Sequence, residues 1–516
     1  MVAVVPSDTL LSMIQEWNGI EFKFGNQSDV VDQIALVDFG SRIALLDLLK
    51  TRTAVKDAAK ESLSEQLKKI KKDEDQHEPK TIHVAFEGKG GLTALILNGD
   101  PGAYFLQDAF RKSFLSVLKV EEEDKRVQVF LRGLNEKHAG IAINWICSLA
   151  VIARYRPQVY GKKADEQKKL GKLTIFIDTN LPKKLADEAL NEGKILGYAN
   201  NQVRYLAELP SNILNPKTYR ERVQTLAKGL GVSFEFLGKK ELIKKGAGAF
   251  LAVVQGDHHE RAGIVHLHYK GKKAKKKLAI VGKGLCFDTG GYNIKTGSFM
   301  NGMHQDMTGS AVTLSLFEAL VKLDAPYEIH AYLALAENLI SYDAYRPNDV
   351  VVACNGVSIE VDNTDAEGRM CLADTLAIAS EEKPDFILDY ATLTGSVIRS
   401  LDTRRCGAYS NMPRVSALAV EVGERSGERV WNFPVGGDYN EAIKSEYADV
   451  RQCSTAQAAD HIYAATFLSK FVGKNIPWLH VDLAAAGNKG GLGLVPTETT
   501  GFGVRFGLEM IREFLA

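Results

Sequence analysis

Strand-like apolar runs alternate with helical segments through the second part of the chain, and this alternation limits the fold more than any other feature of the sequence. Such alternation is typical of an α/β domain whose helices cover the faces of a sheet. Residues 308–323 and 370–380 show the apolar spacing of helices. The expected strands of this region are residues 278–281, 329–335, 350–353, 358–361 and 386–389.

Two turns are expected between these strands. Asn355 and Gly356 lie between two β-rich runs, and Asn-Gly is a strong signal for a two-residue hairpin, so the sheet should also carry an antiparallel pair. Six lysines join two further strand-like runs, and we interpret their segment as a solvated hairpin turn and not as a nucleic-acid site. They are Lys270, Lys272, Lys273, Lys275, Lys276 and Lys277.

The pattern changes near residue 180, and a length of 516 residues exceeds what one core usually supports. Before that point, strands are expected at 81–86, 127–131 and 173–177, with a helix at 63–72 and a solvated charged run at 68–80. A long helix over 185–209 ends at Pro210, which cannot continue it. We therefore expect an α/β protein with a small N-terminal α/β domain (1–182), a linker helix (183–209) and a larger C-terminal mixed-sheet α/β domain (210–516).

Charge and apolar content exclude several classes of protein. The 64 basic and 64 acidic residues cancel, which argues against attraction of the whole chain to nucleic acid or to a membrane. Residues 1–6 lack the features of a secretory signal, and the longest apolar stretch, around 141–153, is too short to span a bilayer. Six cysteines lie far apart with no C-x-x-C pair, as expected of free thiols. These features predict a cytoplasmic protein without disulfides.

Charged residues gather in a glycine-rich segment that follows a predicted strand. Lys283 ends the strand, Asp288 follows it by five positions, and Lys295 follows Asp288 by seven. In open α/β sheets, sites are built outside the carboxyl ends of strands. Taken one at a time, each residue has an ordinary interpretation, because an aspartate can cap a turn and a lysine is usually solvated.

Three further carboxylates belong to the same pattern. Asp306 precedes a helix, where it would be an ordinary helix cap, and Asp365 and Glu367 follow the strand at 358–361. In an extended backbone, residues i and i+2 point the same way. With Asp288, four carboxylates would crowd one pocket, and cations must neutralise such a group. Oxygen ligands with few histidines suit Mg, Mn or Zn, and two such ions form a common hydrolytic site.

Several segments of the second domain match a known pattern. They are residues 281–284, 287–295, 303–307 and, most specifically, the run from Asn363 to Met370. Together they resemble the leucine aminopeptidase, or cytosol aminopeptidase, family. The resemblance covers about residue 185 to the C-terminus, which would make 210–516 a di-metal peptidase domain. Supporting matches are Glu337-Asn338, Arg346-Pro347, residues 390–395 and residues 210–213.

The resemblance implies two divalent metal ions per subunit, Zn or Mn with Mg or Co as further options. Asp288, Asp365 and Glu367 would hold one ion, together with the Asp365 backbone carbonyl. The second ion would take Lys283, Asp288, Asp306 and Glu367, so that Asp288 and Glu367 bridge. Lys283 would then bind as a neutral amine, its pKa lowered by the metal.

The resemblance also implies a reaction and an assembly. Lys295 would stabilise the developing oxyanion, and Arg369 would hold a bicarbonate that acts as general base. The protein would release N-terminal residues, with a leucine-type preference, from peptides that have a free N-terminus. It would form a homohexamer of two stacked trimers. Four residues match positions that line the family's substrate pocket: Met303, Thr392, Leu393 and Gly395.

Two alternatives stay open at this point. One is a catalytically silent or moonlighting member of the family that acts as a structural or DNA-binding protein, although the full set of presumed site residues is present. The other is a different two-metal hydrolase, such as a phosphatase or a dipeptidase, whose sites usually include histidine ligands. His304 and Cys286 depart from the usual family residues, which we expect to affect packing or selectivity and not metal binding.

Overall fold

The computed structural model describes residues 19–26, 33–39, 80–85, 91–97, 103–454 and 458–516. Within these residues the chain forms two compact units. The N-terminal unit holds the described residues up to Asn201 together with Gly490–Thr497, and the C-terminal unit holds the rest. The predicted helix at 63–72 lies outside the described residues, as does almost all of the charged run at 68–80.

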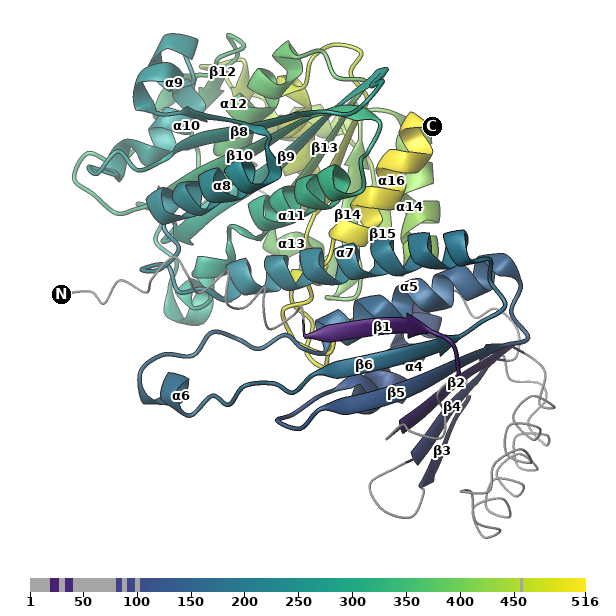
Figure 1. Cartoon of the computed structure of the whole chain (residues 1–516). Coiled ribbons are helices and arrows are strands. Elements are labelled where there is room, and N and C mark those ends of the chain that lie inside the picture. The colour runs from purple at the N-terminus through teal and green to yellow at the C-terminus, as the bar shows by residue number, and fades with distance from the viewer. Residues whose placement is uncertain (1–18, 27–32, 40–79, 86–90, 98–102, 455–457) are drawn as a thin grey trace. The chain divides into compact units, whose positions relative to one another are not determined.

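The N-terminal unit contains a six-stranded sheet in the order β1-β6-β5-β2-β4-β3 (Figure 1). Its neighbouring strands are parallel except for the antiparallel pair β3 and β4. Helices α4 (Ala103–Leu118) and α5 (Glu136–Ile152) pack against one another and bury an apolar core with β5 and β6. The strands are β1 (Ile20–Phe24), β2 (Gln33–Phe39), β3 (Lys80–Ala85), β4 (Gly91–Leu97), β5 (Lys125–Arg132) and β6 (Leu173–Asp178).

Helix α7 (Lys183–Glu208) confirms the long helix expected before Pro210. The division between the two units falls inside this helix, after Asn201. The domain limits at 182 and 210 stay predictions. No helix among the described residues is long and apolar enough to cross a bilayer. All six cysteines are free, as expected from their spacing.

The C-terminal unit is built on an eight-stranded mixed sheet in the order β15-β14-β17-β13-β9-β10-β8-β7. Strands β17, β13, β9 and β10 run parallel, and β8 lies antiparallel beside β10. This arrangement confirms the predicted mixed-sheet α/β class. The strands are β7 (Ser233–Leu237), β8 (Gly263–Lys270), β9 (Lys276–Asp288), β10 (Tyr327–Asn338), β13 (Phe386–Ala391), β14 (Cys406–Ser410), β15 (Val430–Phe433) and β17 (Trp478–Asp482).

Helices α11 (Thr308–Lys322) and α12 (Glu367–Glu381) cover opposite faces of this sheet (Figure 1). The contacts of two adjacent residues of β9 show the same arrangement. A Cβ atom on Gly282 would come within 2.6 Å of the α11 backbone, whereas the Lys283 side chain passes Gly368 of α12. Successive strand residues point to opposite faces. The other helices of the unit are α8 (Pro216–Leu230), α9 (Lys239–Lys245), α10 (Gly248–Val253), α13 (Gly395–Leu401), α14 (Pro413–Ser426), α15 (Asp460–Leu468) and α16 (Val504–Leu515).

Two turn predictions need correction. β11 (Val350–Val352) and β12 (Ser358–Glu360) form an antiparallel hairpin, but it belongs to a separate three-stranded sheet with β16 (Val450–Arg451). Its loop is longer than two residues, since the Ala353 amide donates to the Val357 carbonyl at 2.9 Å. The left-handed Gly356, with φ of 88°, closes the loop.

The lysine-rich segment between β8 and β9 is not a hairpin turn. Strand β10 lies between β8 and β9 in the sheet, so the segment passes over the end of β10. The Gly271 amide donates to the Tyr327 carbonyl at 2.9 Å and fixes this crossing. The local pattern of two strand-like runs around a short polar segment does not reveal that a third strand separates them.

Candidate metal centre

Strand β9 presents Lys283 and Asp288 on one face, although an odd spacing of five residues would normally point them to opposite faces. The register against β10 shifts by one residue, because Leu285 pairs with Ala336 and Phe287 pairs with Glu337. Cys286 is therefore an extra residue in β9, as in a β-bulge. Contrary to the prediction, the strand continues past Lys283, and this bulge brings Asp288 to the α12 face.

The Asp288 carboxylate is held from three sides. Its Oδ1 accepts from Asn338 Nδ2 and from the Gly290 amide, each at 2.9 Å. Its Oδ2 lies 2.7 Å from Lys295 Nζ. Gly290 has a left-handed backbone with φ of 86°, and the turn that it forms brings Lys295 back over the end of the strand.

Asp365 and Glu367 do not lie in an extended segment, so the reason given for their convergence was wrong. Asp365 lies in the turn after β12, and Glu367 is the first residue of α12. The turn is fixed by Thr364, whose hydroxyl donates to the Gly290 carbonyl at 2.7 Å. The Thr364 carbonyl accepts from Asn338 Nδ2 at 3.0 Å. The two segments that carry the carboxylates are therefore bonded directly to one another.

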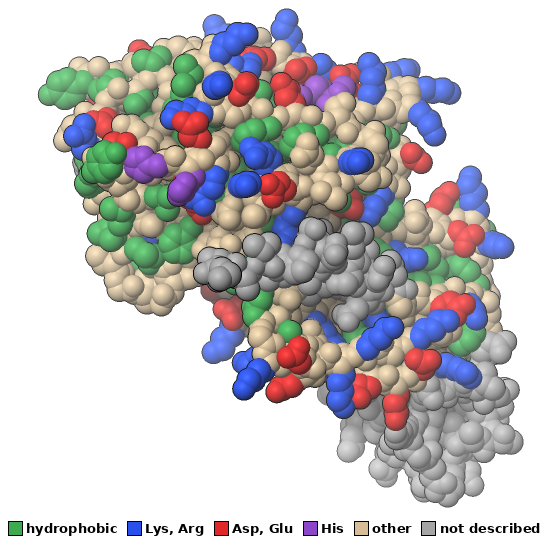
Figure 2. Space-filling model, turned by 60° about the vertical axis from the view of Figure 1, so that its left-hand side comes forward, with side chains coloured by type: hydrophobic (Ala, Val, Ile, Leu, Met, Phe, Trp, Pro, Cys, Tyr) green, Lys and Arg blue, Asp and Glu red, His purple; other side chains and the backbone are tan. Residues whose placement is uncertain are grey.

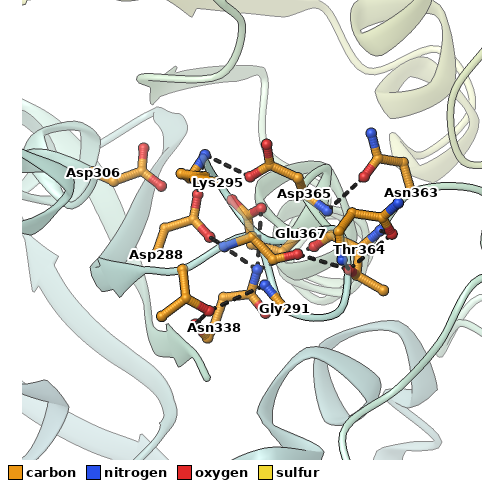
Figure 3. A network of polar contacts seen from close by, with 12 residues as sticks. Asp288, Gly291, Lys295, Asp306, Asn338, Asn363, Thr364, Asp365 and Glu367 are labelled. Atoms are coloured by element: carbon orange, nitrogen blue, oxygen red, sulfur yellow. Dashed lines mark hydrogen bonds and ion pairs between the residues drawn. The ribbon is translucent and has the colours of Figure 1, made fainter. Parts of the chain in front are cut away.

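The carboxylates nevertheless converge, as Figure 3 shows for Asp288, Asp365 and Glu367. One oxygen of each lies within 4.8 Å of the others, a spacing that can hold a metal ion. Lys295 lies between two of them, with its Nζ 2.5 Å from Asp365 Oδ1. Three carboxylates from two separate segments thus form one group with a cation beside it.

Asp306 completes the group through Lys283. Lys283 Nζ lies 2.7 Å from Asp306 Oδ2 and 3.1 Å from Glu367 Oε1, and it donates to the Thr392 carbonyl at 3.1 Å. A Cβ atom on Gly368 would come within 2.5 Å of the Lys283 side chain, so that position requires glycine. The buried lysine therefore joins Asp306 to the other three carboxylates.

The charges of the site perturb the pKa values of its members. Burial raises the pKa of Asp306 to about 7, and burial together with the Glu367 charge raises the pKa of Asp365 to about 6. Burial alone would lower the pKa of Lys283 and of Lys295, but the surrounding carboxylates raise both above the ordinary range. Four carboxylates beside two ammonium groups leave an excess of negative charge, which suits divalent cations.

Arg369 lies in the first turn of α12 and is buried. Its guanidinium donates to the Gln452 carbonyl at 3.1 Å and pairs with Asp460 at 2.8 Å. Its Nε has no hydrogen-bond partner among the described residues. Within that part of the chain Arg369 makes no ion pair with the four carboxylates, so it lies beside the cluster and not in it.

The residues expected to line a substrate pocket lie in two connections next to the carboxylates. Thr392 touches the cluster directly, since its hydroxyl donates to Asp306 Oδ1 at 2.7 Å. The Leu393 amide donates to Asp482, and Gly395 begins α13 with open space where a Cβ atom would be. Met303 begins the 3-10 helix directly before Asp306.

Residues 201–507 match the catalytic domain of the cytosol aminopeptidase family. The chain belongs to this family. A "Probable cytosol aminopeptidase" of Persephonella marina is 37% identical over 76% of this chain and 75% of its own length, and one of Aquifex aeolicus is 37% identical over 78% and 81%. A solved leucyl aminopeptidase from Trypanosoma cruzi covers 98% of this chain and all of its own, with a TM-score of 0.78 and 25% identity.

As a member of the cytosol aminopeptidase family, the protein is a metal-dependent exopeptidase that acts on peptides. The carboxylate group described above offers the family's metal a fitting donor set. The match favours an aminopeptidase over a structural or DNA-binding protein and over a phosphatase. On the face drawn in Figure 2, basic and acidic side chains are interspersed, as expected from the balanced composition.

The converging carboxylates and lysines of this candidate site were named from the sequence, but Asp460 and the neutral residues around them were not assigned a role. Asn338 bridges Asp288 and Thr364, and Gln452 accepts from the Asp362 and Asn363 amides. Asn338 stood in a recognised segment, so its signal was available. Gln452 lies far along the chain, and no local pattern points to it.

Proposed function

We propose that this aminopeptidase binds two divalent metal ions in the carboxylate cluster and uses them to release N-terminal residues, with a leucine-type preference, from peptides. The observation that carries the proposal is the convergence of Asp288, Asp365 and Glu367 within 4.8 Å. These three residues would hold one ion. The second would take Lys283 and Asp306 together with Asp288 and Glu367 as bridges. When bound, the ions would supply Lewis-acid activation of a water and of the scissile carbonyl.

Lys283 has a defined part in this proposal. Its ammonium group now lies against Asp306 and Glu367, where it balances part of their charge. To donate a nitrogen lone pair to a metal it must lose its proton, which a nearby dication favours. Zn and Mn are the metals that we expect, with Mg and Co as further options.

In this proposal Lys295 would act on the substrate. Its side chain is partly exposed, whereas Lys283 is buried, so Lys295 lies on the open side of the cluster. An ammonium group at this point can stabilise negative charge on a carbonyl oxygen as it develops. Met303, Thr392, Leu393 and Gly395 would form the neighbouring substrate pocket.

Arg369 would hold a bicarbonate that accepts the proton of the attacking water. The support is its buried Nε, which has no hydrogen-bond partner among the described residues and is free to donate to an anion. A positively charged guanidinium binds a planar oxyanion well. The bicarbonate would supply the general base that no histidine or glutamate side chain offers here.

The assembly and location follow from the family alone. We propose a homohexamer in the cytoplasm, without nucleic-acid or membrane binding, built from the domains 1–182, 183–209 and 210–516. Light scattering of the purified protein tests the assembly. A monomer at working concentration would contradict it.

The activity is tested with a pair of matched substrates. The protein should hydrolyse leucine amide, should stop when a chelator is added, and should recover with Mn or Zn. The N-acetylated form of the same amide should resist cleavage, because the free amine is recognised. Equal cleavage of both substrates, or full activity after complete removal of metal, would overturn the proposal.

A further inference from the structure

A second group of metal-ligating side chains lies on the same sheet. His268 of β8 and Glu328 and His330 of β10 bring their ligand atoms within 4.8 Å of one another. His330 precedes Asn338 by eight residues on β10, and Asn338 contacts the carboxylate cluster through Asp288. At a rise of about 3.3 Å per residue, His330 lies roughly 26 Å from that cluster. The group is therefore distinct from the site described above.

The sheet register places these three residues together. His330 pairs directly with His268 across the antiparallel strands β10 and β8, and their rings stack with centroids 4.5 Å apart. Glu328 lies two residues before His330 and therefore on the same face. The three side chains are held by two central strands and not by a loop, so their geometry is preorganised.

Hydrogen bonds set the tautomer of the neutral His330 ring. The ionised Glu235 carboxylate can only accept, so the His266 Nδ1 beside it, at 3.3 Å, must donate. The Nε2 of a neutral His266 is then an acceptor, and His330 Nδ1, at 3.0 Å, donates to it. The Nε2 of a neutral His330 is consequently left with a free lone pair. Metal-ligating histidines commonly have their second nitrogen fixed in this way.

Burial favours the neutral form of His330 and of His266. It lowers the pKa of His330 to about 4 and also lowers the pKa of His266. The His330 side chain is only 5% exposed, and its Nε2 has no hydrogen-bond partner among the described residues. His268 Nε2 is also buried and has no hydrogen-bond partner among those residues. Two buried nitrogens thus lack a partner at one point of the sheet.

The distances fit a tetrahedral metal ion. Glu328 Oε1 lies 3.4 Å from His268 Nε2 and 3.4 Å from His330 Nε2. These distances exceed the 2.7–3.2 Å of ordinary hydrogen bonds. Ligands bound to zinc at about 2.0–2.1 Å in a tetrahedron lie about 3.3–3.4 Å apart. The observed separations therefore correspond to the edges of such a tetrahedron.

A second carboxylate and two lysines surround the group. Glu382, the residue that caps the end of α12, has its Oε2 3.8 Å from His330 Nε2. Lys277 Nζ lies 3.4 Å from Glu382 and 3.8 Å from Glu328, and Lys270 Nζ lies 3.6 Å from Glu328. Both lysines reach solvent, so a dication can displace them, and they compete with it for the same carboxylates.

We propose that His268, Glu328 and His330 bind one divalent transition-metal ion of the zinc class, with Glu382 placed to act as a fourth ligand. Two imidazoles and one carboxylate favour Zn²⁺ or Co²⁺ over the hard ions Mg²⁺ and Ca²⁺. The ion would join β8 and β10 to the end of α12. Its role would be structural, since the group is remote from the carboxylate cluster.

Titration of the metal-free full-length protein with Zn²⁺ and with Co²⁺ tests this site. The wild type should bind one more equivalent than His268→Gln, a change at a partly exposed side chain that leaves the sheet intact. The Co²⁺ form should lose a tetrahedral absorption band in that variant. His259→Gln alters an exposed histidine outside the group and should match the wild type. Since the carboxylate cluster is the same in all three proteins, the difference is independent of the proposed function.

A second variant gives a result that misfolding cannot mimic. Lys277→Met removes a competing cation and should tighten binding of Zn²⁺ at this site by roughly tenfold or more, the factor typical of changes around a metal site. Leucine amide hydrolysis should be unchanged in His268→Gln. Equal numbers of bound Zn²⁺ in the wild type and His268→Gln would overturn the proposal, as would unchanged affinity in Lys277→Met.

Discussion

Asn338 offers the sharpest test of how the carboxylate cluster is held. It is a buried neutral residue at the end of β10, and its Nδ2 donates to Asp288 Oδ1 at 2.9 Å and to the Thr364 carbonyl at 3.0 Å. It thereby links the two segments that supply the presumed metal ligands. Asn338→Ala removes both bonds and leaves the charges of the site unchanged.

The expected magnitude follows from what each acceptor keeps. Asp288 Oδ1 still accepts from the Gly290 amide, and the Thr364 carbonyl still accepts from the Tyr345 hydroxyl at 2.8 Å. Asp288 and Thr364 each keep a partner, and the third contact, to Glu367 Oε2 at 3.5 Å, is long and weak, so the loss is that of two hydrogen bonds, about 2–4 kcal/mol in unfolding free energy. Metal affinity should fall about 10–100-fold, as for other residues that orient a metal ligand.

Two measurements check this prediction together. Urea unfolding of the metal-free protein gives the loss in stability, and chelator-buffered titration with Zn²⁺ gives the loss in affinity. Asn355→Ala, in the exposed hairpin loop, is the matched control and should change neither metal affinity nor activity. If Asn338→Ala binds metal as tightly as the wild type, Asn338 does not orient Asp288 and this reasoning is wrong.

Three more predictions concern charged residues. Glu367→Ala removes a bridging carboxylate and should lose both metal and activity. Lys295→Ala should keep its metals and lose a factor of about 10²–10³ in rate. Metal analysis and turnover measurements of both variants test these two expectations. Arg369→Ala should also keep its metals, and part of its lost rate should return with added bicarbonate, which a rate insensitive to bicarbonate would contradict. Buried His480 pairs with Asp389 at 2.6 Å; burial alone would lower the pKa of His480, but this carboxylate raises it. Its contribution to stability is therefore present below about pH 6.5 and lost as pH rises through the folded pKa. Urea unfolding should show a smaller decline between pH 6 and 9 in His480→Gln, and equal declines would argue against a charged pair.

Much of the fold could be predicted because its elements carry strong local patterns. The helices at 308–323 and 370–380 and the central strands were found near their observed positions. The end of β9 was missed for a physical reason. Gly282 and Gly284 look like turn residues, yet they lie inside a strand, where a Cβ atom on either would collide with neighbouring backbone. Close packing, and not a turn, explains these glycines.

Partners distant along the chain were harder to predict. The separate sheet of β11, β12 and β16 joins residues about 90 positions apart, and nothing near Asn355 indicates that strand. In the site, charged residues were singled out because a group of carboxylates needs cations wherever it converges. Asn338 and Gln452 were not assigned, because a neutral amide carries no charge that demands an explanation.

The bulge at Cys286 makes the sensitivity of this enzyme to changes in length very uneven. In a surface loop, loss of one residue is usually absorbed by the neighbouring backbone. In β9, loss of Cys286 would likewise restore a regular alternation and leave Asp288 opposite Asn338 and facing α12, whereas a residue gained between Lys283 and Asp288 would need a second bulge to keep that pairing. All the site residues would still be present in the gene, in the same order and almost at the same spacing. A homologue that carries every ligand but has one residue more between Lys283 and Asp288 should therefore be assayed before it is regarded as active.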